Sequence, residues 1–182
     1  ITFKDLTFDN IYHEHYNYWS LTSLTNFFNQ FNVKIYKAEK IDTHGGSLRV
    51  YISKNLKIKI TTSVKKILDE EEKFGIKKFE TYEKFGEKIN KIKKNVLRNI
   101  DMIKSNNNKI IGYGSPAKAT TALNFFGISK EIDCIIEDNK LKQGKYLPGV
   151  NIPIVNGKKK ITSDSTLLVL AWNFYNEIKK KN

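Results

Sequence analysis

The stretch Lys109-Ile-Ile-Gly-Tyr-Gly-Ser-Pro-Ala-Lys-Ala119 determines the fold class of this 182-residue chain. Its apolar first part predicts a strand over 109–113. Pro116 lies near the start and Gly127 just past the end of the next segment, which predicts a helix over 117–126. A strand, a tight turn and a helix in succession are typical of an α/β unit.

The glycines of this stretch fit the pattern G-x-G-x-x-A, with Gly112 and Gly114 in the turn. The acidic residues Glu137 and Asp138 follow at the end of the next expected strand, as they do in dinucleotide-binding folds. Backbone N–H groups at such a helix N-terminus bind phosphate, and Lys118 adds positive charge there. An NAD-type site and a site for another phosphate-bearing ligand both remain open, and a close turn also needs glycine for packing alone.

The rest of the second half predicts a parallel sheet. Near-continuous apolar runs over 132–136 and 167–171 predict buried strands, and a last helix is expected over 174–181. Such strands joined by helices indicate a Rossmann-like α/β fold with helices on both faces of the sheet. Trp172 and Asn173 follow the strand at 167–171, where α/β sheets place ligand-binding residues, although Trp172 could equally belong to the core.

The first half predicts helices around a strand hairpin. The expected elements are a helix over 22–31 capped by Ser20, strands over 33–41 and 48–53 joined by a turn at 44–46, a helix over 63–74 ended by Gly75, and a long amphipathic helix over 79–103. Alternation places Ile35 on one face of the first strand and Ala38 on the other. We therefore divide the chain into parts at 1–55, 56–105 and 106–182.

Composition excludes some classes of protein. The net charge is +13, but almost all basic residues are Lys, with Arg only at Arg49 and Arg98, so we interpret the charge as a solvated surface and expect no nucleic-acid partner. No apolar run approaches the length of about 18 residues that a membrane span needs. The single cysteine, Cys134, excludes an internal disulfide and fits a cytoplasmic location.

The residues richest in acid–base chemistry are Tyr12, His13, Glu14 and His15, in the stretch Phe-Asp-Asn-Ile-Tyr-His-Glu-His-Tyr over 8–16. Such groups transfer protons near neutral pH. A metal site that uses His13, His15 and His44 is a weaker interpretation, because His-x-His alone is a poor chelate and no Cys lies nearby. Ordinary hydrogen bonding within a loop is the structural alternative.

Three blocks together suggest a family: Phe-Asp-x-Ile-Tyr-His-Glu-His-x-x-Tyr over 8–18, His-Gly-Gly-Ser-Leu-Arg-Val-Tyr over 44–51 and Gly-Tyr-Gly-Ser-Pro-Ala-Lys-Ala over 112–119. In this order they resemble the SAM-dependent C-methyltransferases that act on nucleotide-linked 4-keto deoxysugars. The resemblance implies that the hairpin ends a methyltransferase domain and that the Rossmann-like half helps to hold the nucleotide-sugar.

The resemblance also implies roles for individual residues. Tyr12 and His15 become the candidate bases that remove a proton beside the ketone, and Glu14 becomes the group that orients them. The residues expected to bind or surround the substrate are His13, His44, Gly112, Gly114, Ser115, Lys118 and Asn173.

Two features of the family are missing from this sequence: the glycine-rich loop that binds S-adenosyl-L-methionine (SAM), and a cysteine-rich zinc-binding segment. We therefore expect the chain to be the C-terminal portion of such an enzyme, to depend on the N-terminal part that binds SAM and zinc, and to be inactive alone. The alternative is a non-catalytic, NAD-type dinucleotide-binding module, based on the glycine-rich turn and Glu137 or Asp138.

Overall fold

The computed structural model describes residues 2–43, 46–157 and 161–181, and the chain forms two compact units. Unit 1 consists mainly of Phe3–Asp5 and His15–Glu87, and unit 2 mainly of Leu6–Glu14 and Lys88–Asn182. A short N-terminal segment therefore belongs to the same unit as the second half of the chain.

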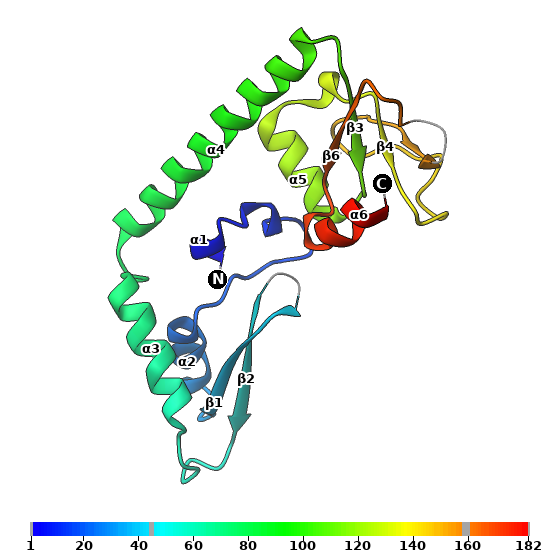
Figure 1. The fold of residues 1–182 in the computed structure, drawn as a ribbon. Coiled ribbons are helices and arrows are strands. Elements are labelled where there is room, and N and C mark those ends of the chain that lie inside the picture. The colour runs from blue at the N-terminus through cyan, green and yellow to red at the C-terminus, as the bar shows by residue number, and fades with distance from the viewer. Residues whose placement is uncertain (1, 44–45, 158–160, 182) are drawn as a thin grey trace. The chain divides into compact units, whose positions relative to one another are not determined.

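Unit 2 contains a four-stranded sheet of β3 (Lys109–Tyr113), β4 (Cys134–Ile136), β5 (Ile154–Val155) and β6 (Ser165–Val169). All neighbouring strands are parallel, in the order β5-β4-β3-β6 (Figure 1). The chain moves outward from β3 through β4 to β5 and then returns to the other side of β3. This reversal creates a topological switch point between β3 and β6, the place where α/β sheets bind ligands.

Helices cover both faces of this sheet, as the sequence predicts. On one face, Ile110 packs with α5 (Ala117–Phe126) and with the C-terminal part of α4 (Phe79–Ser105). On the other face, the neighbouring β3 residues pack with Ile178 of α6 (Tyr175–Lys181). The Rossmann-like α/β class is therefore confirmed.

Strand ends differ from the sequence prediction for a local reason. The strand expected to reach residue 171 ends at Val169, because the N–H groups of Leu170 and Ala171 both turn toward the carbonyl oxygen of Tyr113, at 2.9 and 3.3 Å. The strand β5 was not predicted, because it has only two residues and so has no alternation by which to recognise it.

Unit 1 is built on an antiparallel pair, β1 (Lys34–Ile41) and β2 (Ser47–Ser53), with α2 (Leu21–Asn29) and α3 (Thr62–Phe74). The predicted helix and hairpin are confirmed. Ser20 caps α2, and Gly75 ends α3 with φ of 78°. The buried core is formed by Leu21, Ile35, Ala38, Val64 and Ile67.

One prediction about the hairpin is wrong. Ile35 and Ala38 were expected on opposite faces of β1, but both side chains are buried in the core of unit 1. The register shifts between Ile35 and Lys37, which marks a β-bulge. A bulge adds one residue to a strand and so reverses the alternation beyond it.

The remaining elements are short. The N-terminal segment contains two helical turns, α1 (Thr2–Asp5) and the 3-10 helix η1 (Phe8–Asn10). Two further 3-10 helices lie in unit 2, η3 (Ser129–Glu131) and η5 (Trp172–Phe174).

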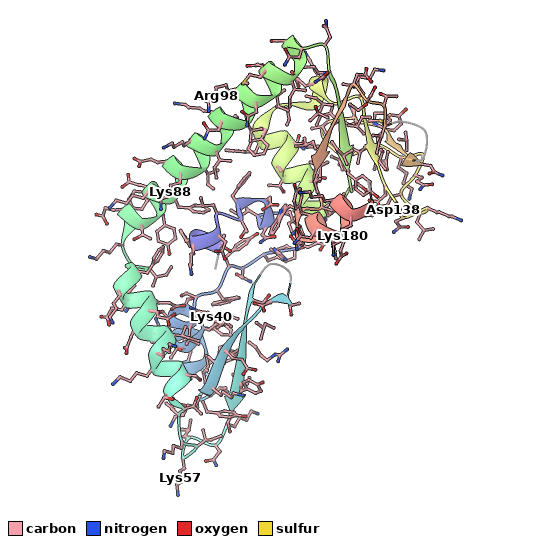
Figure 2. All side chains as sticks on the ribbon, viewed as in Figure 1. Lys40, Lys57, Lys88, Arg98, Asp138 and Lys180 are labelled. Atoms are coloured by element: carbon pink, nitrogen blue, oxygen red, sulfur yellow. The ribbon has the colours of Figure 1, made fainter. Side chains whose placement is uncertain are left out.

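The surface carries many charges, as composition implies. Lys88 and Arg98 lie along α4 and are exposed (Figure 2). In the described part of the chain, no helix combines the length and the apolar character that crossing a bilayer requires.

Glu71 of α3 joins two elements of unit 1. Its carboxylate accepts hydrogen bonds from the N–H groups of Leu21 and Thr22 and from the Thr22 hydroxyl, at 2.7, 2.8 and 2.6 Å. These N–H groups belong to the first turn of α2 and have no partner within the helix. The carboxylate therefore caps α2 from a distant part of the sequence.

We expect Glu71→Ala to lower the free energy of unfolding of unit 1 by about 1–3 kcal/mol, because it leaves these donors unsatisfied. Urea denaturation followed by Trp19 fluorescence, in a Trp172→Phe background, measures this effect. The matched control is Glu72→Ala on the exposed side of the same helix, for which we expect a change within about 0.5 kcal/mol. Equal effects of the two substitutions would contradict the capping role.

Candidate functional site

The chain segments that follow β3 and β6 meet at the switch point. Gly114 has φ of +82°, and a Cβ atom placed there would lie 2.6 Å from the Cβ of Ala171. Both the backbone conformation and the close approach therefore require glycine at this position.

Gly112 lies within β3, where its neighbours leave little room for a side chain. A Cβ atom at this position would lie 2.9 Å from Cγ1 of Ile135 and 3.1 Å from Cδ1 of Leu170. Packing inside the sheet is therefore enough to explain this glycine. The G-x-G-x-x-A pattern can therefore indicate tight packing as well as ligand binding.

We expect Gly114→Ala to destabilise unit 2 by about 2–5 kcal/mol, the sum of left-handed strain and overpacking. Gly127→Ala is the matched control, because Gly127 also has a positive φ of 73° but has no atom within 4 Å of its Cβ position. The control should cost only about 1–2 kcal/mol. Urea denaturation followed by Trp172 fluorescence in a Trp19→Phe background measures both, and equal costs would contradict the close approach.

The donors of Ser115 are taken by a carboxylate within the chain. Oε2 of Glu137 accepts hydrogen bonds from the N–H and the hydroxyl of Ser115, at 2.9 and 2.6 Å, and Oε1 accepts one from the N–H of Asn139 at 3.0 Å. The ammonium of Lys142 donates to the carbonyl oxygen of Ser115 at 2.9 Å. The Glu137 carboxylate thus occupies donors that an anionic ligand could use. The sequence predicted this acidic residue near the turn but not its bonds to Ser115.

The pKa of Glu137 reflects this arrangement. Burial alone would raise the pKa of this carboxyl, but the hydrogen bonds from Ser115 and Asn139 and the nearby Lys142 ammonium lower it below its usual value. The native state therefore favours the ionised form more than the unfolded chain does.

This pKa shift predicts how the effect of Glu137→Gln depends on pH. A lowered native pKa contributes stability that is present above the ordinary glutamate value near 4.3 and is lost as pH falls through the native value. The difference in unfolding free energy between the wild-type chain and Glu137→Gln should therefore be largest near neutral pH and shrink below about pH 4.3. Urea denaturation of both proteins between about pH 7 and pH 3 tests this, and a constant difference would contradict it.

Lys118, Trp172 and Asn173 form a cluster on the α5 side of the switch point. Nζ of Lys118 lies 4.1 Å from the centre of the Trp172 ring and donates a hydrogen bond to Oδ1 of Asn173 at 2.8 Å. Burial lowers the pKa of Lys118, and the charge of Asp9 acts in the opposite direction. The structure thus brings together two of the predicted substrate-binding residues, which are 55 positions apart in the sequence.

The N-terminal segment of unit 2 contacts the same cluster. Oδ2 of Asp9 accepts a hydrogen bond from the indole N–H of Trp172 at 2.6 Å, and the Ile11 carbonyl oxygen accepts one from the Thr121 hydroxyl at 3.2 Å. The ring of Phe8 packs against Phe125 and Phe126 of α5, with ring centres 4.9 and 5.6 Å apart. Sequence reasoning did not assign roles to Asp9 or Thr121, although Asp9 belongs to the first block of the family resemblance.

The predicted acid–base residues follow directly after this segment. Tyr12 is half-buried, with its ring 6.1 Å from that of His13, while His13 and Glu14 are exposed. His15 is exposed, and its ring lies 5.9 Å from that of Tyr18. The first three of these residues belong to unit 2 and His15 to unit 1.

His44 lies outside the described residues, so its predicted place in the site has no structural description. Within the described ranges, no three His, Cys, Asp or Glu side chains gather to hold a metal ion.

A hollow of about 340 Å³ lies on the α6 side of the glycine-rich turn. Its lining includes Tyr113, Ser115, Asp138, Lys142 and Phe174. The Tyr113 hydroxyl donates to Oδ2 of Asp138 at 3.0 Å, and Asp138 is exposed at the end of β4 (Figure 2). Hydroxyl, carboxylate and ammonium groups around an aromatic side chain suit a polar, hydroxyl-bearing ligand.

Comparison with known proteins shows which family the chain belongs to. A family model described as the C-methyltransferase C-terminal domain matches residues 42–182. The C-methyltransferase NovU of Streptomyces niveus is 31% identical over 178 residues, which cover 96% of this chain and 42% of that protein. The chain thus spans less than half the length of this relative, and it belongs to the family of C-methyltransferase C-terminal domains.

Proposed function

We propose that this chain is the substrate-binding and acid–base part of a SAM-dependent C-methyltransferase that acts on a nucleotide-linked 4-keto deoxysugar. The observation that carries the proposal is the hydrogen bond between Asp9 and Trp172. It places the start of the Tyr12–Glu14 motif in the same unit as Lys118 and the switch point of the parallel sheet. A proton-transfer motif beside a cationic ligand site is the arrangement that this reaction needs.

The chemistry begins with the substrate ketone at C4, which makes the proton on C3 acidic. Tyr12 and His15 would remove this proton, the electron pair would move into an enolate, and C3 would then attack an electrophilic methyl group. Glu14 would orient the histidine and balance its charge. A base near its ordinary pKa is sufficient when a hydrogen bond stabilises the enolate oxygen as its charge develops.

SAM supplies the methyl group in this family of reactions. In the described part of the chain, the glycine-rich turn does not fit a SAM-binding loop, because the donors of Ser115 are bonded to Glu137. We therefore assign SAM binding to the N-terminal part of the full-length protein and propose that the chain alone is inactive. The chain has a single cysteine, Cys134, which is buried, and we propose a reducing location such as the cytoplasm.

We assign the substrate phosphates to the N-terminus of α5. Pro116 precedes this helix without a side-chain cap, and Lys118 in the first turn adds a positive charge to this helix N-terminus. Asn173 would complete this subsite, and His13 and His44 would contact the sugar. Gly112 would allow close packing of β3 before the turn, Gly114 would shape the turn, and Ser115 would support it through Glu137.

The NAD-type alternative is less favoured by the geometry of Glu137. In a dinucleotide site, the acidic residue at this place accepts hydrogen bonds from ribose hydroxyls, and the turn donates to a pyrophosphate. Here both carboxylate oxygens of Glu137 already accept hydrogen bonds from the protein, and the Ser115 N–H is one of the donors. A pyrophosphate at Ser115 would also approach this carboxylate.

A thermal-shift comparison of the 182-residue chain with dTDP, NAD, NADP and SAM separates the two functions, because a ligand that binds only the native state raises the melting temperature. We expect stabilisation by dTDP and little effect of SAM. Stabilisation by NAD or NADP without an effect of dTDP would support the alternative.

The reaction itself is tested in the full-length protein with SAM and a panel of dTDP-, UDP- and GDP-linked 4-keto deoxysugars. Mass spectrometry and NMR of the product should locate the new methyl group on a ring carbon. A methyl group on oxygen or nitrogen would contradict the proposal.

A further inference from the structure

We propose that Asp9 and Trp172 are positioning residues of this reaction. The hydrogen bond between their side chains holds Tyr12 beside Lys118, the cation that we assign to the substrate phosphates. This inference rests on the proposed function, because it concerns how the acid–base motif is held in register with the substrate.

Asp9 is a buried carboxylate. It lies in η1 and is only 7% exposed. A buried carboxylate is costly unless it is hydrogen-bonded, and the indole N–H of Trp172 supplies a bond at 2.6 Å. An indole N–H only donates, and its direction is set by the ring, so the pair defines one orientation of η1 relative to the end of β6.

Attachment alone does not require this carboxylate. The Phe8 ring already packs against Phe125 and Phe126, which buries apolar surface between η1 and α5. An aliphatic side chain at position 9 would serve adhesion as well, since buried charged groups add little net stability and can instead specify geometry. A buried polar pair next to an apolar contact is therefore suited to fixing the orientation of η1 on α5.

The orientation of η1 determines the position of Tyr12 because only a short length of chain separates them. Ile11, the residue immediately before Tyr12, accepts the hydrogen bond from Thr121 of α5. Lys118 lies three positions before Thr121 and so on the same face of the helix, with about 5–6 Å between Cβ atoms. Consecutive Cα atoms are about 3.8 Å apart, so the backbone of Tyr12 follows directly on the Ile11 carbonyl group that Thr121 holds.

Trp172 contacts both Asp9 and Lys118. The N–H at its edge bonds to Asp9, and the face of its ring lies 4.1 Å from Nζ of Lys118. Asn173, the next residue, accepts the Lys118 hydrogen bond. The charge of Asp9 also acts on Lys118, whose pKa it raises against the effect of burial. One side chain thus connects the acid–base segment to the proposed phosphate-binding cation.

The test uses Asp9→Asn and Trp172→Phe in the full-length protein, alone and together. Asp9→Asn keeps the shape and an acceptor oxygen but removes the charge, and Trp172→Phe keeps an aromatic ring but removes the N–H. We expect each to lower kcat about tenfold to hundredfold with KM little changed, because a misplaced catalytic group loses rate rather than binding. The double variant should be no slower than the slower single variant, since Asp9→Asn weakens and Trp172→Phe removes the same bond.

Exchange of the C3 proton in deuterated water without SAM should fall in parallel with kcat, measured with the panel substrate that the unsubstituted protein turns over. Asp133→Asn and Trp19→Phe, which change exposed side chains, are the matched controls and should leave both rates unchanged. Rates are expressed per folded molecule, with the folded fraction taken from circular dichroism.

Two results would overturn the positioning role alone: an unchanged kcat per folded molecule in both variants, or a rise in KM without a fall in kcat. Absence of C3 exchange in the unsubstituted protein with every substrate of the panel would instead overturn the proposed function itself. The two failures are therefore distinguishable in one set of measurements.

Discussion

Tyr12→Phe and His15→Gln in the full-length protein are each expected to lower kcat about 10²- to 10⁴-fold, with KM little changed. The reason is that a general base acts on the transition state and contributes little to substrate binding. Tyr12→Phe keeps the ring and removes the hydroxyl, and His15→Gln keeps hydrogen bonding and removes the basic nitrogen. Steady-state kinetics of methyl transfer and C3 hydrogen exchange without SAM are the two measurements.

The double variant distinguishes a working pair from two separate contributions. If Tyr12 and His15 transfer one proton together, the combined loss should be much smaller than the product of the single losses. The two residues are three positions apart, and an extended chain spans at most about 3.6 Å per residue, so covalent continuity keeps them within about 11 Å.

The matched control for this pair is Tyr16→Phe, because Tyr16 lies in the same stretch and is 91% exposed. It should leave kcat unchanged. Normal C3 exchange in the Tyr12→Phe, His15→Gln double variant would show that another residue is the base and that the motif is structural.

The parts of the fold that the sequence predicts are those in which local pattern and burial agree. The strand at Lys109–Tyr113 is a continuous apolar run. The helices at Leu21–Asn29 and Ala117–Phe126 combine periodic apolar residues with recognisable residues at their ends. The bulge in β1 escaped prediction, because the register shift between Ile35 and Lys37 depends on the partner strand. Pattern alone also could not recognise a strand as short as β5.

The sequence indicated several residues of the candidate site but not the contacts between them. Lys118 and Asn173 were both expected near a ligand, and their hydrogen bond confirms only that they meet. The Asp9–Trp172 bond joins positions 163 residues apart, and the bond from Ser115 to Glu137 depends on the turn after β4. Such pairs follow from tertiary packing, for which a single sequence contains no periodic indication.

Lys118→Met should weaken dTDP binding to the 182-residue chain about tenfold to hundredfold. Tyr12→Phe and His15→Gln, in contrast, should act on kcat. A hydrogen bond to a charged group contributes about 1.5–3 kcal/mol, and methionine keeps the length of the side chain without its charge. Isothermal titration calorimetry measures the affinity. The affinity of the wild-type chain should also fall with increasing salt, and more steeply than that of Lys118→Met.

Lys93→Met is the matched control, because the ammonium of Lys93 also lies over an aromatic ring of unit 2, 4.8 Å from the centre of Phe125. Its loss should leave dTDP affinity unchanged. Asn173→Asp provides a test in the same direction as Lys118→Met, since a carboxylate beside the Lys118 ammonium would compete with the phosphates and weaken binding. If Lys118→Met binds dTDP as tightly as the wild-type chain, the phosphates bind elsewhere, and the hollow beside Tyr113 and Lys142 becomes the better candidate.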